Sequence, residues 1–190
     1  MSKIIETRSI IEAIYYILFK LGKTDKLKLL KLVYLADKYH LIYYGRTITN
    51  DDYYAMKHGP IASTVMDVLE FDEFSLSEEE YEYASSLFKK VDEHDLKPNE
   101  GVEIVLDMLS ETDKEALNYV IEKFGSWPSL KLREYSHKYP EWYQYKELFE
   151  KDRIKRERIE TEELLSIIDE NFPVSVEHLE ESRKIVTGDF

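Results

Sequence analysis

The chain has 190 residues, of which 43% are hydrophobic, and a net charge of −13 at pH 7. This length suits a single domain with its own core, and the composition excludes a disordered chain. The absence of cysteine excludes disulfides and zinc–thiolate sites, and the apolar runs are too short to cross a bilayer, so we expect a cytoplasmic protein without a membrane partner.

Two helices are predicted at the start of the chain. Apolar residues at three- and four-residue spacing favour a helix over about residues 7–21, ended by Gly22. A second helix, capped by Thr24 or Asp25, runs to about residue 44 and stops at Gly45. Its apolar side should contain Leu29, Leu30, Val33, Ala36 and Leu41. Its charged residues should lie mostly away from that side, namely Lys26, Lys28, Lys31, Asp37 and Lys38.

A short β segment is predicted next. Residues 46–52 form a polar turn, and the paired tyrosines in residues 53–57 favour a strand. Gly59 and Pro60 then break the strand. Pro60 suits the first turn of a helix, so we expect a helix to start there, with Ile61 and Val65 on its apolar side.

The middle of the chain carries the whole excess of negative charge. Residues 67–115 contain 17 acidic and 4 basic residues, a net charge of −13, whereas residues 1–66 carry a net charge of +4. Such a field repels nucleic-acid phosphates and attracts basic partners, although solubility alone explains it equally well. A capping box at Ser77 opens a short helix, and residues 87–96 favour a hairpin or an irregular segment.

The second half of the chain is predicted to be mostly helical. We expect a short helix over residues 102–108, a helix from the capping box of Ser110 and Asp113 to Phe124, a helix between Pro128 and Pro140, and another with Trp142 and Phe149 on one side. Residues 150–165 form a linker or a solvated helix, and a short helix follows near the end. The fold class is therefore mainly α, a compact single-domain helical fold with a small antiparallel β element near residues 53–57 and 87–96. Residues 1–150 form the domain, and residues 151–190 form a charged C-terminal helical extension.

The sequence contains no motif of a known enzyme class. It has no glycine-rich phosphate loop, no HExxH and no GxSxG, and its five histidines are far apart. We therefore expect no enzyme, no cofactor and no metal. Lysines at positions 20, 23, 26, 28 and 31 cluster around one helix junction and are either solvated or in contact with phosphates. A DNA-binding transcription regulator is accordingly one hypothesis, but we do not expect a nucleic-acid partner.

Two blocks of the sequence resemble the Panacea-domain family, which includes the SocA antitoxin and phage-associated relatives. The first is KLLKLVYLADKYHLIYYGRTIT followed by YYAMKHGPIASTVMDVL. Its matching residues are Lys31, Leu32, Tyr34, Ala36, Tyr39, His40, Tyr44, Gly45, Arg46, Ala55, Lys57, Gly59 and Pro60. The second combines the helix over residues 109–124 with Leu132, Ser136, His137, Pro140 and Trp142, with Ser136 where the family often has threonine. Together the blocks cover roughly residues 5–150.

The resemblance implies an antitoxin of a toxin–antitoxin system that neutralises a protein toxin, encoded next to it, by direct binding. Members of this family neutralise very different toxins by protein contact, and one relative delivers its toxin to a protease. A protease adaptor is therefore the second hypothesis, with a protease as a further partner. The family supplies no catalytic residues to transfer.

Seven residues are candidates for contacts with that partner: Tyr39, His40, Arg46, Tyr53, Lys57, His58 and Trp142. Tyr39 and His40, together with Tyr44, are more simply explained as core under the strand. Arg46 either pairs with Asp37 or Asp51 and fixes the turn, or contacts a toxin carboxylate.

The other candidates also have structural alternatives. Lys57 and His58 alternate along the strand, so only one of them should face inward. Trp142 is either core or a partly exposed anchor. We expect His137 to be a buried histidine with satisfied hydrogen bonds, and Gly45 and Gly59 to serve the backbone by a positive φ or close packing.

Overall fold

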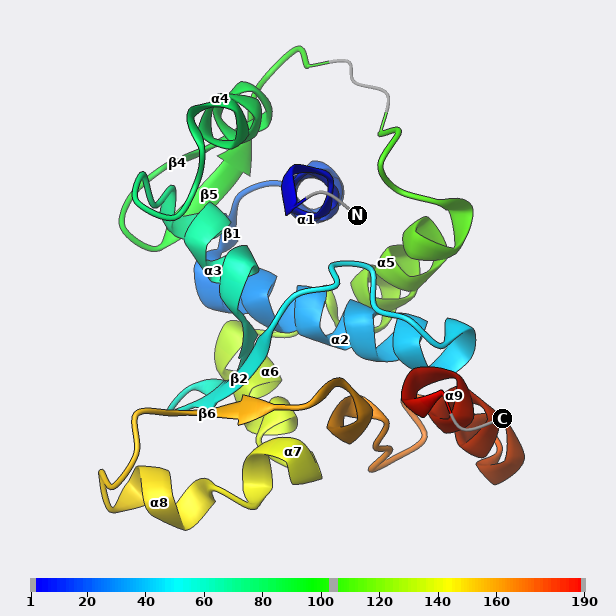
Figure 1. Cartoon of the computed structure of the whole chain (residues 1–190). Helices are drawn as coiled ribbons and strands as arrows, with labels where there is room; N and C mark the ends of the chain where they lie inside the picture. The colour runs from blue at the N-terminus through cyan, green and yellow to red at the C-terminus, as the bar shows by residue number, and fades with distance from the viewer. Residues whose placement is uncertain (1–2, 103–105, 189–190) are drawn as a thin grey trace.

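Helix α2 (Lys26–Tyr44) is the centre of the fold. The computed structural model describes residues 3–102 and 106–188, and side chains from Thr7 onward. Helices α1 (Lys3–Leu21), α5 (Glu111–Phe124), α6 (Ser129–Ser136) and α9 (Val176–Thr187) all contact α2. Figure 1 shows α2 crossing the middle of the molecule, between α1 and α6.

Two small antiparallel sheets complete the fold. One has the order β1 (Thr24–Asp25), β5 (Asp95–Pro98), β4 (Phe88–Lys90), and the other has the order β3 (Gly59–Ala62), β2 (Tyr53–Met56), β6 (Arg156–Ile159). Helices α3 (Ser63–Glu70) and α4 (Glu78–Leu87) pack on α1. The short helices α7 (Pro140–Tyr143) and α8 (Lys146–Glu150) follow α6 (Figure 1). The mainly α class with a small β element is confirmed, and the two expected β segments lie in different sheets.

The helix ends follow the local sequence signals. The Asp25 side chain accepts a hydrogen bond from the backbone N–H of Lys28, and both predicted capping boxes, at Ser77 and Ser110, are formed. Gly45 ends α2 with a φ of +71°. These signals are local, so they operate whatever the rest of the fold does.

The expectation that the charged residues of α2 lie on a solvated side is wrong for three of them. Lys31, Asp37 and Lys38 are completely buried. The reason is that α2 has neighbours on every side, namely α1, α3, α5, α6, α9 and β3, so it has no face left for solvent over most of its length. Each buried charge needs a polar partner inside the molecule.

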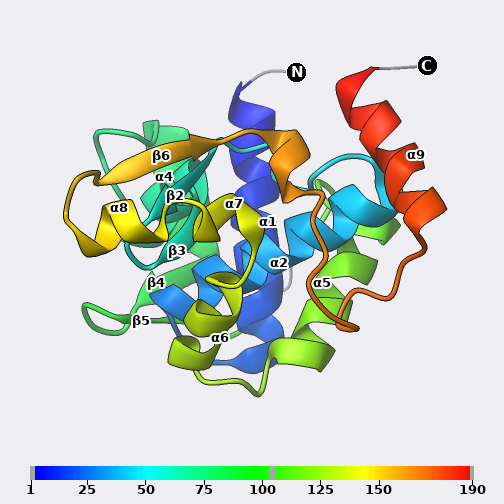
Figure 2. The ribbon, with the colours of Figure 1, turned by 90° about the horizontal axis from the view of Figure 1, so that it is seen from below.

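Residues 150–165 form neither a linker nor a solvated helix. Residues Arg156–Ile159 are strand β6, which lies beside β2 (Figure 2) and pairs with it in the register Tyr53 opposite Ile159. A 3₁₀ helix (Thr161–Leu164) follows, and Leu164, Leu165 and Phe172 are buried in the core. The C-terminal segment is therefore integrated into the fold, with α9 beside the end of α2 (Figure 2).

Two further expectations are wrong. Gly59 and Pro60 belong to strand β3, and the helix begins only at Ser63, because Pro60 lies opposite Ala55 in a hairpin. Of the helix expected over residues 102–108, residues 103–105 lie outside the described part, and residues 102 and 106–108 are not helical. Among the described residues, no helix combines the length and apolar character needed to span a membrane.

Candidate partner-binding site

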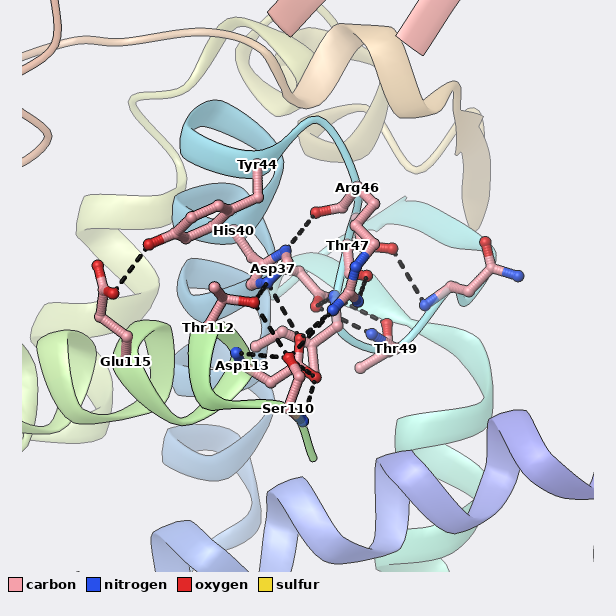
Figure 3. Close-up of polar contacts among 12 residues, drawn as sticks. Asp37, His40, Tyr44, Arg46, Thr47, Thr49, Ser110, Thr112, Asp113 and Glu115 are labelled. Carbon is pink, nitrogen blue, oxygen red and sulfur yellow. Dashed lines mark hydrogen bonds and ion pairs between the residues drawn. The ribbon is translucent and has the colours of Figure 1, made fainter. Parts of the chain in front are cut away.

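The candidate residues are divided between three places. Tyr39, His40 and Arg46 lie in a polar seam between the C-terminal half of α2, the loop 46–50 and the start of α5. Figure 3 shows His40 and Arg46 in this seam. Tyr53 lies under this loop, and Lys57, His58 and Trp142 line a separate cavity. The structure therefore does not bring the seven candidates into one site.

His40 is at the centre of the polar seam and is completely buried. Its Nδ1 lies 2.8 Å from the carbonyl oxygen of Arg46, and because a carbonyl only accepts, Nδ1 carries the proton and donates. Nε2 lies 3.0 Å from the hydroxyl of Thr112 and 3.1 Å from Oδ1 of Asp113 (Figure 3). His40 thus ties the loop after α2 to the first turn of α5, which is a structural role.

Arg46 pairs with neither Asp37 nor Asp51, contrary to expectation. Its Nη2 lies 2.8 Å from Oδ1 of Asp113, while about half of the Arg46 side chain stays exposed. Burial raises the pKa of Asp113, but hydrogen bonds from His40 and Ser110 and the charge of Arg46 outweigh burial and lower the pKa to about 2. Asp113 is therefore ionised at neutral pH.

Asp37 fixes the conformation of the loop 46–50 by accepting hydrogen bonds from it. One carboxylate oxygen accepts from the backbone N–H groups of Ile48 (2.8 Å) and Thr49 (3.1 Å), and the other accepts from the hydroxyls of Thr49 and Tyr53. Burial raises the pKa of Asp37 to about 6 even though these hydrogen bonds oppose it. The Tyr53 hydroxyl lies 2.5 Å from Asp37, so Tyr53 is a core residue and not a surface contact.

Tyr39 and Tyr44, near the end of α2, face α5 and not the strand. Tyr39 is buried, packs against the rings of Tyr43 and Tyr119, and donates to Oε1 of Glu115 at 3.0 Å. Tyr44 is partly exposed and donates to Oε2 of the same carboxylate at 2.8 Å (Figure 3). The expected core role is correct for Tyr39 and His40, but their partner element is α5.

Lys57, His58 and Trp142 meet at a cavity of about 450 Å³, here called the turn cavity. Lys57 and His58 occupy the turn between β2 and β3 and are both exposed, so the expected inward–outward alternation does not apply there. Trp142 is buried, and its Nε1 donates to the carbonyl oxygen of Met56 at 2.7 Å. The Trp142 ring stacks on His137 with 3.6 Å between ring centroids and 2° between planes.

Gly59 permits this packing. Its φ is +101°, and a Cβ at this position would lie 2.7 Å from both Nζ of Lys31 and Oγ of Ser136. The predicted backbone role of Gly59 is thus confirmed on both grounds, positive φ and close approach. The prediction that His137 has all its hydrogen bonds satisfied is wrong, because its Nε2 is buried with no hydrogen-bond partner.

A third surface surrounds Phe74, in the loop between α3 and α4. The Phe74 side chain is fully exposed, with exposed Glu73 beside it and exposed Glu78 in the same hollow as Glu73. The carboxylate of Asp72 accepts from the backbone N–H of Phe74 at 2.9 Å, which fixes the turn. We call Glu73, Phe74 and Glu78 the acidic knob.

Phe74 was not among the residues predicted from the sequence to bind a partner, although its sequence context indicated exposure. A phenylalanine in an acidic stretch between two helices belongs to no apolar stripe, so it has no expected place in the core. Arg133 was missed as well, and its position four residues before His137 was the corresponding signal.

The lysines of the first helix junction do not form a free basic surface. Lys23 pairs with Asp95 at 2.8 Å, Lys26 pairs with Glu70 at 2.6 Å, and Lys31 is buried. Lys28 donates to the carbonyl oxygen of Gly125. Four of the five lysines are thus engaged within the protein, which weakens the hypothesis of DNA binding through this cluster.

A comparison with protein-family models matches residues 29–143 to the antitoxin SocA-like, Panacea domain family. The chain belongs to this family. The match includes the whole polar seam, the β2–β3 turn and Trp142, whereas α1, β6 and α9 lie outside it. No curated protein and no solved structure matches the chain.

Proposed function

We propose that this Panacea-domain protein is an antitoxin that neutralises a protein toxin by binding it directly, without catalysis. The single observation that supports the proposal is the family match over residues 29–143, which is more than half of the chain. The supporting surface is the acidic knob, because it combines an exposed aromatic anchor with carboxylates in a chain whose negative charge is concentrated at residues 67–115.

The knob has the features of a preorganised protein contact. Aromatic residues are frequent energetic centres of interfaces, and charges around them steer an oppositely charged partner. Phe71 and Leu76, on either side of the loop, pack into the core, so the exposed ring of Phe74 is held on an ordered turn. Less conformational entropy is then lost on binding. The expected partner surface is an apolar pocket with basic residues around it.

The first test is a pull-down of the tagged protein from cells that co-express the neighbouring open reading frame, paired with growth rescue. We expect a stable complex together with rescue. Rescue with disappearance of the partner would instead favour the protease adaptor, and neither complex nor rescue would contradict the antitoxin function.

The second test locates the contact. Phe74→Ala should weaken toxin binding about tenfold or more, because a central aromatic anchor is worth about 2 kcal/mol, and should leave the melting temperature unchanged. Phe19→Ala is the matched control, since Phe19 is also largely exposed but lies on α1. Glu73→Lys with Glu78→Lys should reduce the salt dependence of binding. Glu80 is unsuitable for charge reversal, because it is buried in the capping box.

A further inference from the structure

The turn cavity is positively charged in a protein that is otherwise strongly acidic. Its cationic side chains are Lys57, Arg133, Lys138 and Lys146, against two carboxylates, Glu134 and Glu150. Lys57 pairs with Asp152 at 3.3 Å and Lys146 with Glu150 at 3.8 Å, both on the exposed rim. Solvent-exposed ion pairs contribute little to stability, so another anion can replace these carboxylates at the cavity.

Arg133 has no counter-ion within the described part of the chain. Its guanidinium makes no ion pair there, and its Nε is buried without a hydrogen-bond partner. His137, one helical turn further on, has a buried Nε2 that is equally unpartnered. A buried donor left unpaired costs about 1–3 kcal/mol, and more when it is charged. Two such nitrogens beside one cavity indicate unused hydrogen-bonding capacity.

Further positive charge lies behind these two residues. Lys31 is buried and donates from Nζ to the carbonyl oxygen of Pro60 at 2.7 Å. Burial and then the charge of Arg133 lower the pKa of Lys31 to about 7. Burial, Lys31 and Arg133 lower the pKa of His137 to about 4, and a hydrogen bond between the His137 ring and the backbone of His58 acts in the opposite direction. The positive charges of Lys31, Arg133 and protonated His137 repel one another, because no carboxylate pairs with Arg133 in the described part of the chain.

The cluster is held rigidly. The His137 ring lies flat on Trp142, Trp142 is hydrogen-bonded to Met56, and the absence of a side chain at Gly59 lets the turn approach α6. Rigid donors lose little entropy when a ligand arrives, so the geometry favours binding over rearrangement.

We infer that the turn cavity binds an oxyanion, a carboxylate or a phosphate, with Arg133 as its principal ligand. A guanidinium matches the two oxygens of either group, and the volume of about 450 Å³ is in the range of small-ligand sites. The anion neutralises Arg133 and favours the protonated forms of Lys31 and His137. This site is distinct from the acidic knob, so its test does not depend on the antitoxin function.

The inference is tested on the full-length protein without any partner. Inorganic phosphate and acetate are titrated at constant ionic strength, with chloride as the reference, while the His137 ring resonances are followed by NMR. We expect a saturable shift of these resonances and a rise in the pH at which His137 titrates. Stronger binding of phosphate points to a phosphorylated small molecule as the natural ligand, and stronger binding of acetate to an acidic side chain.

Variants separate specific binding from a general charge effect. Arg133→Gln should weaken binding of the preferred anion about tenfold or more, and Lys138→Gln, on the cavity rim, should weaken it less. Lys89→Gln removes one positive charge from exposed β4 and should leave binding unchanged. Melting temperatures check that each variant is folded. The inference would be overturned if phosphate and acetate caused no saturable shift beyond that of chloride. It would also be overturned if wild type, Arg133→Gln and Lys138→Gln all bound the preferred anion equally well.

Discussion

Asp113 combines three interactions in one carboxylate. It closes the capping box of α5 with Ser110, lies 3.1 Å from Nε2 of His40 and pairs with Arg46. Asp113→Asn should lower the free energy of unfolding at pH 7 by about 1–3 kcal/mol, because a buried group loses its ion pair with Arg46 and its charge-assisted hydrogen bonds from Ser110. Urea denaturation measures this change. Glu111→Gln, in the same helical turn but exposed, is the control and should change stability little.

The pH dependence of this effect follows from the lowered pKa of Asp113. A carboxylate with a pKa of about 2 in the folded protein and an ordinary pKa of 3.8 stabilises the fold above pH 4, and this contribution is lost as the pH falls toward 2. The difference between wild type and Asp113→Asn should therefore shrink between pH 4 and pH 2. A constant difference over that range would contradict the assignment.

Lys31 changes stability in the same direction as Asp113 but at higher pH, because burial also lowers the pKa of this base. Its pKa of about 7 lies below the ordinary value of 10.5, so between these values the unfolded chain binds more protons than the folded chain, and the contribution of Lys31 to stability rises with pH. Lys31→Met removes this dependence. The stability of wild type relative to Lys31→Met should increase from pH 7 to pH 10, as measured by urea denaturation. A difference independent of pH would argue against a lowered pKa.

The β2–β3 hairpin depends on Gly59. Gly22 also has a positive φ, but a Cβ there would meet no atom within 4 Å, whereas at Gly59 a Cβ would collide with Lys31 and Ser136. Gly22→Ala therefore measures backbone strain alone, about 1 kcal/mol, and Gly59→Ala should cost at least about 2 kcal/mol because a steric clash is added. Thermal or urea unfolding of both variants gives the comparison, and equal losses would show that the close approach has no energetic consequence.

Helices and strands were predicted correctly where the sequence signal for them lies within a few adjacent residues. The caps at Asp25, Ser77 and Ser110 were predicted from a few adjacent residues, because a cap is completed within one helical turn. Strand β3 was missed because Pro60 is typical of a helix start, and only its pairing with Ala55 makes it a strand residue. Strand β6 was missed because its exposed, charged residues acquire strand structure only by pairing with β2.

For the whole molecule, the structure predicts that residues 151–190 cannot be removed without loss of the fold. Lys38, which is buried, has its Nζ 2.7 Å from Oε1 of Glu141 and donates to the carbonyl oxygen of Leu164 at 2.7 Å, so the C-terminal segment helps to solvate a buried ion pair. A chain ending at residue 150 should lose cooperative thermal unfolding. A chain ending at residue 174 keeps β6 and Phe172 and should remain folded, with a lower melting temperature because α9 is missing.

These truncations also test the predicted division of the chain at residue 150. Circular dichroism melts and size-exclusion chromatography are sufficient measurements. A chain of residues 1–150 that melts cooperatively at the wild-type temperature would support an independent domain there and contradict the integration described above.

The candidate site was predictable only in part. The segment with Gly45, Arg46, Gly59 and the Lys57–His58 turn was recognised from its resemblance to a family, and the family match confirms that recognition. Which of these residues are exposed was not predictable, because Tyr53 and Trp142 are buried by contacts with distant parts of the chain. Arg133 was not singled out: its spacing of four residues from His137 was visible in the sequence, but its lack of a counter-ion is recognised only when its surroundings are known.

Local chemistry in the chain was sufficient to predict its mainly helical class, most of its helix ends and the backbone role of Gly59. The family was recognised from the resemblance of two sequence blocks. Packing around α2 determined the rest. It buried Lys31, Asp37 and Lys38, paired Arg46 with Asp113, recruited residues 156–159 into a sheet and left Phe74 and the turn cavity at the surface. The physical reason is range: caps and turns are completed within a few residues, whereas burial, ion pairing and strand pairing depend on residues that are distant in sequence.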